Sequence, residues 1–466
     1  MKILKIIAVL FILISPNLSL NAQQAQNPII HADVPDLSMI RVGKIYYMAS
    51  TTMHMNPGLP IMKSTDLVNW KIVSYAYDTL NTSDPLALNN GKVDYGRGSW
   101  ASSLRYHKGT YYATTFSGTT GETYIFSTKD IEKGPWKRKS FKPSLHDHSV
   151  FFEDDGKAYM VYGAGKITLV ELNDDLSGIK KDTKPKIIIE NASLPAGTNI
   201  NLQSEGSQLF KIDGKYYIFH ITWPRNGMRT VVIHRSDNLM GPYEGKIGLQ
   251  DLGVAQGGLI STPEGNWFAY LFRDYGAVGR IPYLVPVKWE QGWPILGVNG
   301  KVPETLNLPL SKGLIPGIVA SDEFNRKKGE PLLPLVWQWN HNPDHQNWSV
   351  GLMLLQKNFG WVGVKNTDGK KSIAMVTAQN GTIVGEDIPS NIKKIYLKGK
   401  CDFTNRTDKG YFSYSLDGEN WKPIGKALQM SYTLPHFMGY RFGLFNYATS
   451  VAGGYVDFDY FRIEAQ

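Results

Sequence analysis

The sequence predicts an all-β protein, with a five-bladed β-propeller followed by a β-sandwich. Three observations lead to this fold class. A glycine followed by a run of aromatic and β-branched residues recurs five times, at intervals of 47 to 66 residues. Most of these units contain a second turn. The composition then changes near Ala320, after a proline-rich stretch, and a chain of 466 residues is long enough for two such domains.

The five recurring segments are predicted to be β-hairpins, because each glycine separates two apolar strands. They read GKIYYMAS, GTYYATTF, GKAYMVYG, GKYYIFHIT and GNWFAYLF, beginning at Gly43, Gly109, Gly156, Gly214 and Gly265. Four units continue into a second turn, in STDLVNW, STKDIEKGPW, LNDDLSG and RSDNLMGPY. Two hairpins give about four strands per unit, and five such units predict a five-bladed propeller. The alternative is a pair of β-sandwiches with coincidental spacing.

The first 22 residues are predicted to be a secretory signal peptide. Two lysines precede an apolar run over residues 6–14, and polar residues then lead to Ala22. The run is too short to span a bilayer, and no cysteine follows it that could carry a lipid. We therefore expect a secreted or periplasmic protein without a membrane anchor. Cys401 is the only cysteine, which excludes an internal disulfide.

The charge and the aromatic content limit the class of partner. The net charge is +9, but lysine and arginine are scattered along the chain and form no dense basic run. A nucleic-acid partner is therefore not expected. Aromatic residues make up 12% of the chain, with 12 Trp and 25 Tyr, which suits a surface that stacks on flat ligands.

Aligning the five units on their hairpin glycines places one functional residue ahead of the first strand of each unit. These residues are Asp36, Trp100, Asp147, Glu205 and Gln256. Two positions later a small residue follows in every unit: Ser38, Ser102, Ser149, Ser207 and Gly258. Residues two apart on a strand share a face, and the first strand of a propeller blade lines the central axis. Three carboxylates, one indole and one amide are therefore expected around a single funnel.

Three readings of these carboxylates are open. Each aspartate alone is explained by turn chemistry, since it readily binds nearby backbone N–H groups. A metal site is a second reading because His146 and His148 flank Asp147, although on an extended strand both histidines would face away from it. Glycoside hydrolysis is the third. An inverting hydrolase needs two carboxyl groups about 6.5–9.5 Å apart, and a third carboxylate raises the pKa of the acid.

Four stretches resemble the sequence blocks of glycoside hydrolase family 43. They are HADVPDLSMIRVGKIYYM, LHDHSVFFEDDGKAYMVYG, SEGSQLFKIDGKYYIF and AQGGLISTPEGNWFAYLFRDYGAVGRIP, within residues 27–302. The resemblance implies a five-bladed propeller that hydrolyses xylosides or arabinosides with inversion. It makes Asp36 the general base, Glu205 the general acid and Asp147 the residue that tunes the pKa of the acid and orients it.

The resemblance also implies the residues that contact the sugar. Trp100 and Arg280 fall where relatives contact the sugar nearest the cleaved bond, and Gln256 is the third expected substrate-binding residue. For Arg280 the alternative is a surface salt bridge. Gln256 stands where many relatives carry a histidine that helps to hold a central cation. We therefore expect no required cofactor, and an axial structural cation is in doubt.

The domain limits follow from these patterns: a signal peptide over 1–22, a catalytic propeller over 23–310 and an accessory sandwich over 320–466. The last part resembles the concanavalin-like sandwich found after the propeller in one group of the family. It lacks about fifty residues of that sandwich between QNWSV and GLMLLQ, so we expect a truncated sandwich that packs on the propeller and shapes the pocket.

The sequence as a whole predicts an exo-acting inverting glycosidase that removes terminal β-D-xylosyl or α-L-arabinofuranosyl residues from plant cell-wall oligosaccharides. An endo-acting arabinanase or xylanase of the same family is the alternative within the enzyme class. A non-catalytic sugar-binding propeller is the alternative outside it. The retaining fructan-hydrolysing propellers are excluded, because no WMNDPN-like or RDP block is present.

Overall fold

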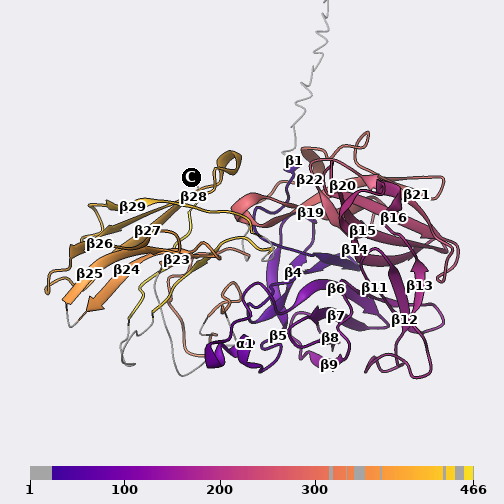
Figure 1. Cartoon of the computed structure of the whole chain (residues 1–466), viewed down its shortest axis with the longest axis horizontal. Coiled ribbons are helices and arrows are strands. Elements are labelled where there is room, and N and C mark those ends of the chain that lie inside the picture. The colour runs from indigo at the N-terminus through magenta and orange to yellow at the C-terminus, as the bar shows by residue number, and fades with distance from the viewer. Residues whose placement is uncertain are drawn as a thin grey trace, which may run out of the picture.

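A computed structural model describes residues 24–313, 318–331, 333–340, 352–367, 370–433, 437–446 and 456–464 (Figure 1). The predicted signal peptide lies outside these residues. Strands dominate the described chain. The helical elements are α1 (Asp84–Ala87) and the 3-10 turns η1 (Asn89–Gly91), η2 (Leu194–Ala196), η3 (Gly276–Val278) and η4 (Thr404–Arg406). No described helix has the length and hydropathy needed to cross a membrane.

Five four-stranded antiparallel sheets follow one another in the first part of the chain. The first two sheets contain β2 (Ser38–Val42), β3 (Ile45–Ala49), β4 (Gly58–Ser64) and β5 (Lys71–Tyr77), then β6 (Trp100–His107), β7 (Thr110–Ser117), β8 (Glu122–Thr128) and β9 (Lys137–Phe141). The third contains β10 (Ser149–Phe152), β11 (Ala158–Tyr162), β12 (Ile167–Glu171) and β13 (Lys186–Ile189). The last two contain β14 (Ile200–Ile212), β15 (Lys215–Pro224), β16 (Thr230–Ser236) and β17 (Glu244–Leu249), then β18 (Ala255–Ser261), β19 (Trp267–Asp274), β20 (Arg280–Glu290) and β21 (Trp293–Leu296).

The hairpin prediction is confirmed in all five sheets. Each recurring glycine lies in the turn between the first and second strands of its sheet, which pair antiparallel. All five glycines have positive φ, between 62° and 90°. Glycine populates this region without the steric cost that a Cβ would bring, which explains why the turn recurs with this residue.

The five sheets form a closed ring. Each first strand contacts the first strand of the next sheet, and β18 returns to contact β2. A buried apolar cluster fills the space between each pair of neighbouring sheets. The cluster that closes the ring joins Met39 and Tyr46 of the first sheet to Tyr270 and Leu284 of the fifth. Burying one large apolar side chain contributes about 1.5–3 kcal/mol, so these clusters hold the ring together. The arrangement fits a propeller.

The C-terminal part is a β-sandwich, shown in orange and yellow in Figure 1. One sheet has five strands: β23 (Leu352–Leu355), β24 (Gly360–Thr367), β25 (Lys370–Thr377), β26 (Gly381–Asp387) and β30 (Arg441–Gly443). The other has three: β27 (Tyr396–Asp402), β28 (Lys409–Ser415) and β29 (Lys422–Gln429). Buried side chains from both sheets form one core. The predicted truncation falls at residues 341–351, which lie outside the described residues.

A two-stranded sheet joins the two ends of the first part of the chain. It pairs β1 (Gln24–Gln26) with β22 (Thr305–Pro309) in antiparallel orientation. The side-chain amide of Asn27 adds hydrogen bonds to the carbonyls of Leu284 and Pro303, at 2.8 and 2.9 Å. This sheet therefore fastens the start of the ring to its end, and Asp36 lies only ten residues beyond it.

Candidate functional site

The five residues found by the repeat alignment lie at the starts of the first strands of the five sheets. Asp36 and Asp147 each stand two residues before their strand, Trp100 begins β6, and Glu205 and Gln256 lie within β14 and β18. Because the first strands form the inner ring, the alignment gathers these residues at one end of it. Asp36, Asp147 and Gln256 are all less than 9% exposed, so they are enclosed rather than spread over the surface.

In each sheet a residue with left-handed backbone turns the chain at the aligned position or one residue after it. Asp36, Asp147 and Gln256 have φ values of 50°, 47° and 51°, and in the other two sheets Ala101 and Gly206 have φ values of 41° and 70°. Such backbone costs about 1–3 kcal/mol at a non-glycine residue, so the surrounding structure has to hold it in place. In the second and fourth sheets the turn falls one residue later. Trp100 and Glu205 are therefore oriented differently from Asp36 and Asp147, although the repeat aligns them.

Asp36 forms a buried ion pair with Arg280. The Arg280 Nη1 donates to Asp36 Oδ1 at 2.6 Å, and the two side chains are only 5% and 4% exposed. Burial raises the pKa of Asp36, the Arg280 charge opposes this shift, and the Glu205 charge adds to it. The second oxygen, Oδ2, is buried without a partner among the described residues. A carboxylate held by one oxygen, with the other free, can bind and deprotonate a water molecule.

A second cluster joins His146, Asp147 and Glu205. One nitrogen or oxygen atom of each lies within 4.8 Å of the others. His146 Nε2 lies 3.0 Å from Glu205 Oε2. The expectation that both histidines face away from Asp147 is wrong for His146, because Asp147 is in a left-handed turn and not on an extended strand. His148 is buried, with Nδ1 2.8 Å from the Leu145 carbonyl oxygen.

The pKa values of Asp147 and His146 in this cluster depend on each other and on Glu205. Burial raises the pKa of Asp147 to about 7, against the opposing charge of His146 and with the support of Glu205. Burial alone would lower the pKa of His146, but the Asp147 charge and the hydrogen bond to Glu205 outweigh it and raise that pKa to about 9. Near neutral pH His146 and a part of the Asp147 population therefore hold protons beside Glu205. Three such ligands could also bind a divalent cation, the alternative that the sequence left open.

The raised pKa of Asp147 makes a prediction about stability. The pKa of this carboxyl group is about 7 in the folded state and 3.8 in the unfolded chain. Because the unfolded chain loses this proton at a lower pH, the group destabilises the folded state progressively as the pH rises from about 4 to 7. We expect Asp147→Asn to change Tm little at pH 4 and to raise it by about 5 °C at pH 8, measured by thermal unfolding. Asp174→Asn, at an aspartate whose side chain is 91% exposed, is the control. Equal effects of Asp147→Asn at both pH values would contradict the raised pKa.

The sandwich contributes side chains to this site. The Phe437 ring meets the Trp100 ring edge-on at 5.4 Å. The Arg280 guanidinium lies between the Phe437 and Phe272 rings, 4.9 and 4.8 Å from their centroids. The Tyr432 hydroxyl donates to Asp274 at 3.0 Å and lies 3.3 Å from Arg280 Nε. Arg280 is thus a buried residue of the site and not part of a surface salt bridge. Sequence reasoning missed Tyr432 and Phe437, because no local pattern shows which loop docks on another domain.

The surroundings of Gln256 do not fit a resident axial cation. Its side chain packs on Gly206, where an added Cβ would lie 2.8 Å from Gln256 Cδ. Arg105 brings a positive charge to the inner strands, donating to Gln208 Oε1 at 3.0 Å and lying 3.5 Å from Ser38 Oγ. The guanidinium charge beside these amide and hydroxyl groups repels a divalent cation. No step proposed below depends on one.

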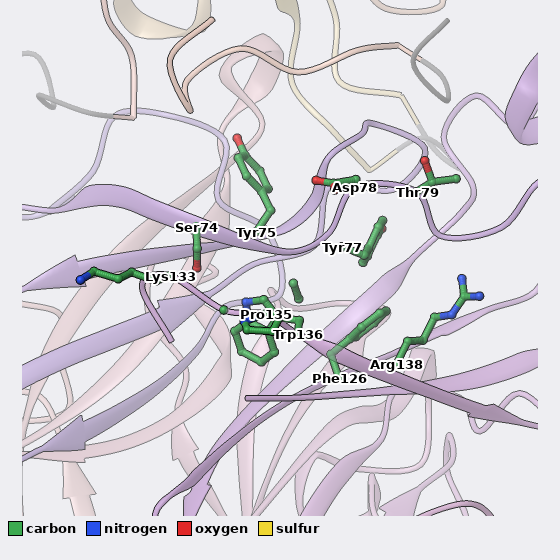
Figure 2. A pocket seen from close by; sticks show the side chains of 12 residues that line it. Ser74, Tyr75, Tyr77, Asp78, Thr79, Phe126, Lys133, Pro135, Trp136 and Arg138 are labelled. Carbon is green, nitrogen blue, oxygen red and sulfur yellow. The ribbon is translucent and has the colours of Figure 1, made fainter. Parts of the chain in front are cut away.

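The cavity shown in Figure 2 does not mark this site. It has a volume of about 500 Å³ and lies at the outer edge between the first two sheets (Figure 2). Its walls come from residues 74–79 and 133–136, together with Phe126 and Arg138. Figure 2 shows Lys133 and Arg138 at opposite ends, with Pro135 and Trp136 between them. None of the predicted site residues lines it, so this cavity is separate from the cluster of buried acids.

Two family profiles match the chain. Residues 25–294 match glycosyl hydrolases family 43, and residues 349–464 match the β-xylosidase C-terminal concanavalin A-like domain. A β-xylosidase of Formosa agariphila is 27% identical, with 94% of this chain and 90% of that protein covered. A non-reducing end α-L-arabinofuranosidase of Bacteroides ovatus is 30% identical, with 72% and 64% covered.

Solved structures agree with this assignment. A bifunctional GH43-CE of Bacteroides eggerthii is 57% identical, with a TM-score of 0.91. The match covers 94% of this chain, which spans 63% of the length of that one. An engineered GH43 enzyme described as having endo-xylanase and exo-arabinofuranosidase activity is 25% identical with a TM-score of 0.80, over 92% and 97% of the two chains. The family profile covers more than half of the residues, and the chain belongs to glycosyl hydrolase family 43.

Proposed function

We propose that the protein is an exo-acting, inverting glycosidase that removes terminal β-D-xylosyl or α-L-arabinofuranosyl residues from plant cell-wall oligosaccharides. The observation that carries the proposal is that Asp36 and Glu205 lie in two different electrostatic environments of one site. One environment favours a carboxylate that acts as a base, and the other favours a carboxyl group that acts as an acid. Asp36 is held by Arg280 with one oxygen free, and Glu205 lies in a cluster that holds protons. The similarity to a β-xylosidase and to a non-reducing end α-L-arabinofuranosidase supports exo-action on these sugars.

In the proposed mechanism Asp36 is the general base. Arg280 fixes Oδ1, so the partnerless Oδ2 is the atom that takes a proton from the attacking water. The oxygen of that water bonds to the anomeric carbon from the face opposite the leaving group, and the configuration inverts. The buried ion pair also keeps Asp36 from rotating away, because breaking it would leave the buried Asp36 charge without its partner.

Glu205 is the proposed general acid, and Asp147 its partner. His146 engages Oε2 of Glu205, which leaves Oε1 to carry the proton to the glycosidic oxygen as the bond to the anomeric carbon breaks. Asp147 lies against Glu205, and its own raised pKa keeps a proton in the cluster near neutral pH. Two carboxyl groups in contact resist ionising together, which is the arrangement that a general acid needs.

Four side chains are proposed to hold the terminal sugar. The Trp100 and Phe437 rings can pack on the apolar face of a pentose, since aromatic rings bury such faces well. Arg280 keeps N–H groups beyond those bound to Asp36 and Tyr432 and can donate to sugar hydroxyls. Gln256, packed beside the Glu205 strand, offers an amide for the same purpose.

The architecture proposed for this function is a five-bladed propeller over residues 23–310 with an accessory sandwich over 320–466. The closed ring of five four-stranded sheets supports the blade number. We further propose that residues 1–22 direct secretion, so that the enzyme meets its polymeric substrate outside the cytoplasm. No cofactor is required for the proposed chemistry.

A panel of glycosides tests the proposal. The full chain is incubated with aryl β-D-xyloside, aryl α-L-arabinofuranoside, xylo-oligosaccharides and linear arabinan, and the first-formed anomer is read by proton NMR. We expect monosaccharide release from the first three and a product anomer opposite to that of the substrate. Oligosaccharide release from arabinan would favour an endo-acting enzyme. Binding of xylo-oligosaccharides without hydrolysis of any substrate would favour a sugar-binding propeller.

A further inference from the structure

Asp33 lies where the ring of sheets meets the sandwich, and it has no role in the proposed chemistry. Its side chain is only 1% exposed. It accepts two hydrogen bonds and forms one ion pair, with partners far apart in the sequence. Oδ1 accepts from the Arg280 backbone N–H at 2.7 Å, and Oδ2 accepts from the Gly439 N–H at 2.9 Å and lies 2.9 Å from Arg441 Nη2. One buried carboxylate thus holds a segment from each domain.

The two segments that Asp33 joins are packed without spare room. A Cβ added to Gly279 would lie 2.2 Å from Asp33 Oδ1, and one added to Gly439 would lie 2.1 Å from the Val278 carbonyl oxygen. The Tyr440 N–H donates to the Ala277 carbonyl at 2.9 Å in the same place. A shift of the sandwich segment would therefore displace the residues that precede Arg280.

Each segment carries a group of the candidate site. Arg280 follows Gly279 and binds Asp36, while Phe437 stands two residues before Gly439 and packs on Trp100 and Arg280. The chain of contacts runs from Arg441 through Asp33 to the Arg280 backbone, and then from the Arg280 side chain to Asp36. Asp33 and Asp36 are also three residues apart on one loop, so displacing either end moves the other.

We propose that Asp33 is a positioning residue, which uses docking of the sandwich segment 437–441 to set the orientation of Arg280 and, through it, of Asp36. This inference rests on the proposed function, because Asp36 and Arg280 are the groups that it positions. The positioning role requires the negatively charged carboxylate of Asp33. An asparagine has one acceptor oxygen in place of two and turns an N–H₂ group toward partners that are themselves donors. Asp33→Asn therefore loses the contact with one of the two domains.

Kinetics of the full chain with aryl β-xyloside or arabinofuranoside test the role. We expect Asp33→Asn to lower kcat/KM about 10²-fold at 20 °C, with kcat and KM both affected, because a displacement of about 1 Å at the reacting groups has that effect. A residue that only holds two domains together would lower Tm and leave kcat/KM of the folded enzyme unchanged. That outcome would overturn the proposal.

A double-mutant cycle separates the Asp33–Arg441 contact from general damage. If Asp33 acts through Arg441, Arg441→Met lowers kcat/KM on its own, and the double variant is little worse than Asp33→Asn alone. Strict multiplication of the two effects would overturn the proposal. Arg462→Met is the matched control, because Arg462 pairs with the exposed Glu323 elsewhere in this part of the chain. It should leave kcat/KM unchanged.

The same variants distinguish failure of this inference from failure of the proposed function. If the wild-type chain hydrolyses no glycoside, the proposed function is wrong. The double-mutant cycle then uses the affinity of each variant for xylose, measured by calorimetry, in place of kcat/KM. Weaker xylose binding by Asp33→Asn, with non-multiplicative effects in the double variant, still supports coupling of Asp33 to the site. Unchanged affinity in all variants overturns it.

Discussion

Replacing Asp36 by alanine is expected to abolish hydrolysis of natural and aryl glycosides alike. The substitution removes the carboxylate that Arg280 anchors through one oxygen and whose second oxygen has no partner among the described residues. General base catalysis contributes about 10²–10⁴-fold, and an aryl leaving group cannot compensate, since the attacking water is the same for every substrate. We expect kcat/KM to fall at least about 10³-fold on both substrate types, measured with aryl β-xyloside and with xylobiose.

Asp78→Ala is the matched control for this experiment. Asp78 is an exposed aspartate at the edge of the outer cavity, away from the inner strands, and its loss should leave both rates unchanged. The Asp36 variant also leaves Arg280 without its buried partner, so its Tm has to be measured alongside. A folded Asp36→Ala enzyme that retains a tenth or more of wild-type activity would remove Asp36 from the role of general base.

The ring of sheets was predictable from the sequence because its signals are local and repeated. A glycine in a tight turn followed by a run of apolar strand residues reports on a few neighbours only, and five copies reinforce one another. The same alignment located Asp36, Asp147 and Glu205, which the structure brings to one end of the inner strands. Equivalent positions in a repeat become neighbours around the axis, so sequence spacing translates directly into convergence.

The orientation of individual side chains was less predictable. Period-two alternation, which placed His146 away from Asp147, holds only on extended backbone, and the left-handed φ of 47° at Asp147 breaks it. An Asp or Asn before a strand is compatible with such a turn but does not require it. His146 could have been found only by treating HDHS as a turn, in which neighbouring side chains no longer point to opposite faces.

Contacts between the domains left no signal in the sequence at all. Phe437, Tyr432 and Arg441 belong to the C-terminal part, and the residues that they meet lie more than 150 positions away. Such contacts depend on how two folded surfaces fit, and single-sequence patterns do not carry that information. These contacts agree with the expectation that the sandwich packs on the propeller, but the sequence identified none of the residues involved.

The second large effect is expected from Glu205→Ala, and it should depend on the leaving group. The leaving group of a natural glycoside departs as an unstable alkoxide unless its oxygen is protonated. A nitrophenolate is a stable anion and departs with little or no protonation. We expect kcat/KM to fall about 10⁴-fold on xylobiose and less than about 10²-fold on nitrophenyl β-xyloside, the range that general acid catalysis covers. Rates for both substrates, measured on one preparation, give the ratio directly.

A glutamate outside the site provides the control for this last experiment. Glu190 has a side chain that is 72% exposed and pairs with Lys166, so Glu190→Ala should leave both rates unchanged. Equal losses on xylobiose and on the nitrophenyl substrate would show that Glu205 does not protonate the leaving oxygen. The proton would then have to come from elsewhere in the cluster, and His146, which lies 3.0 Å from Glu205 and is raised to a pKa of about 9, would be the group to test next.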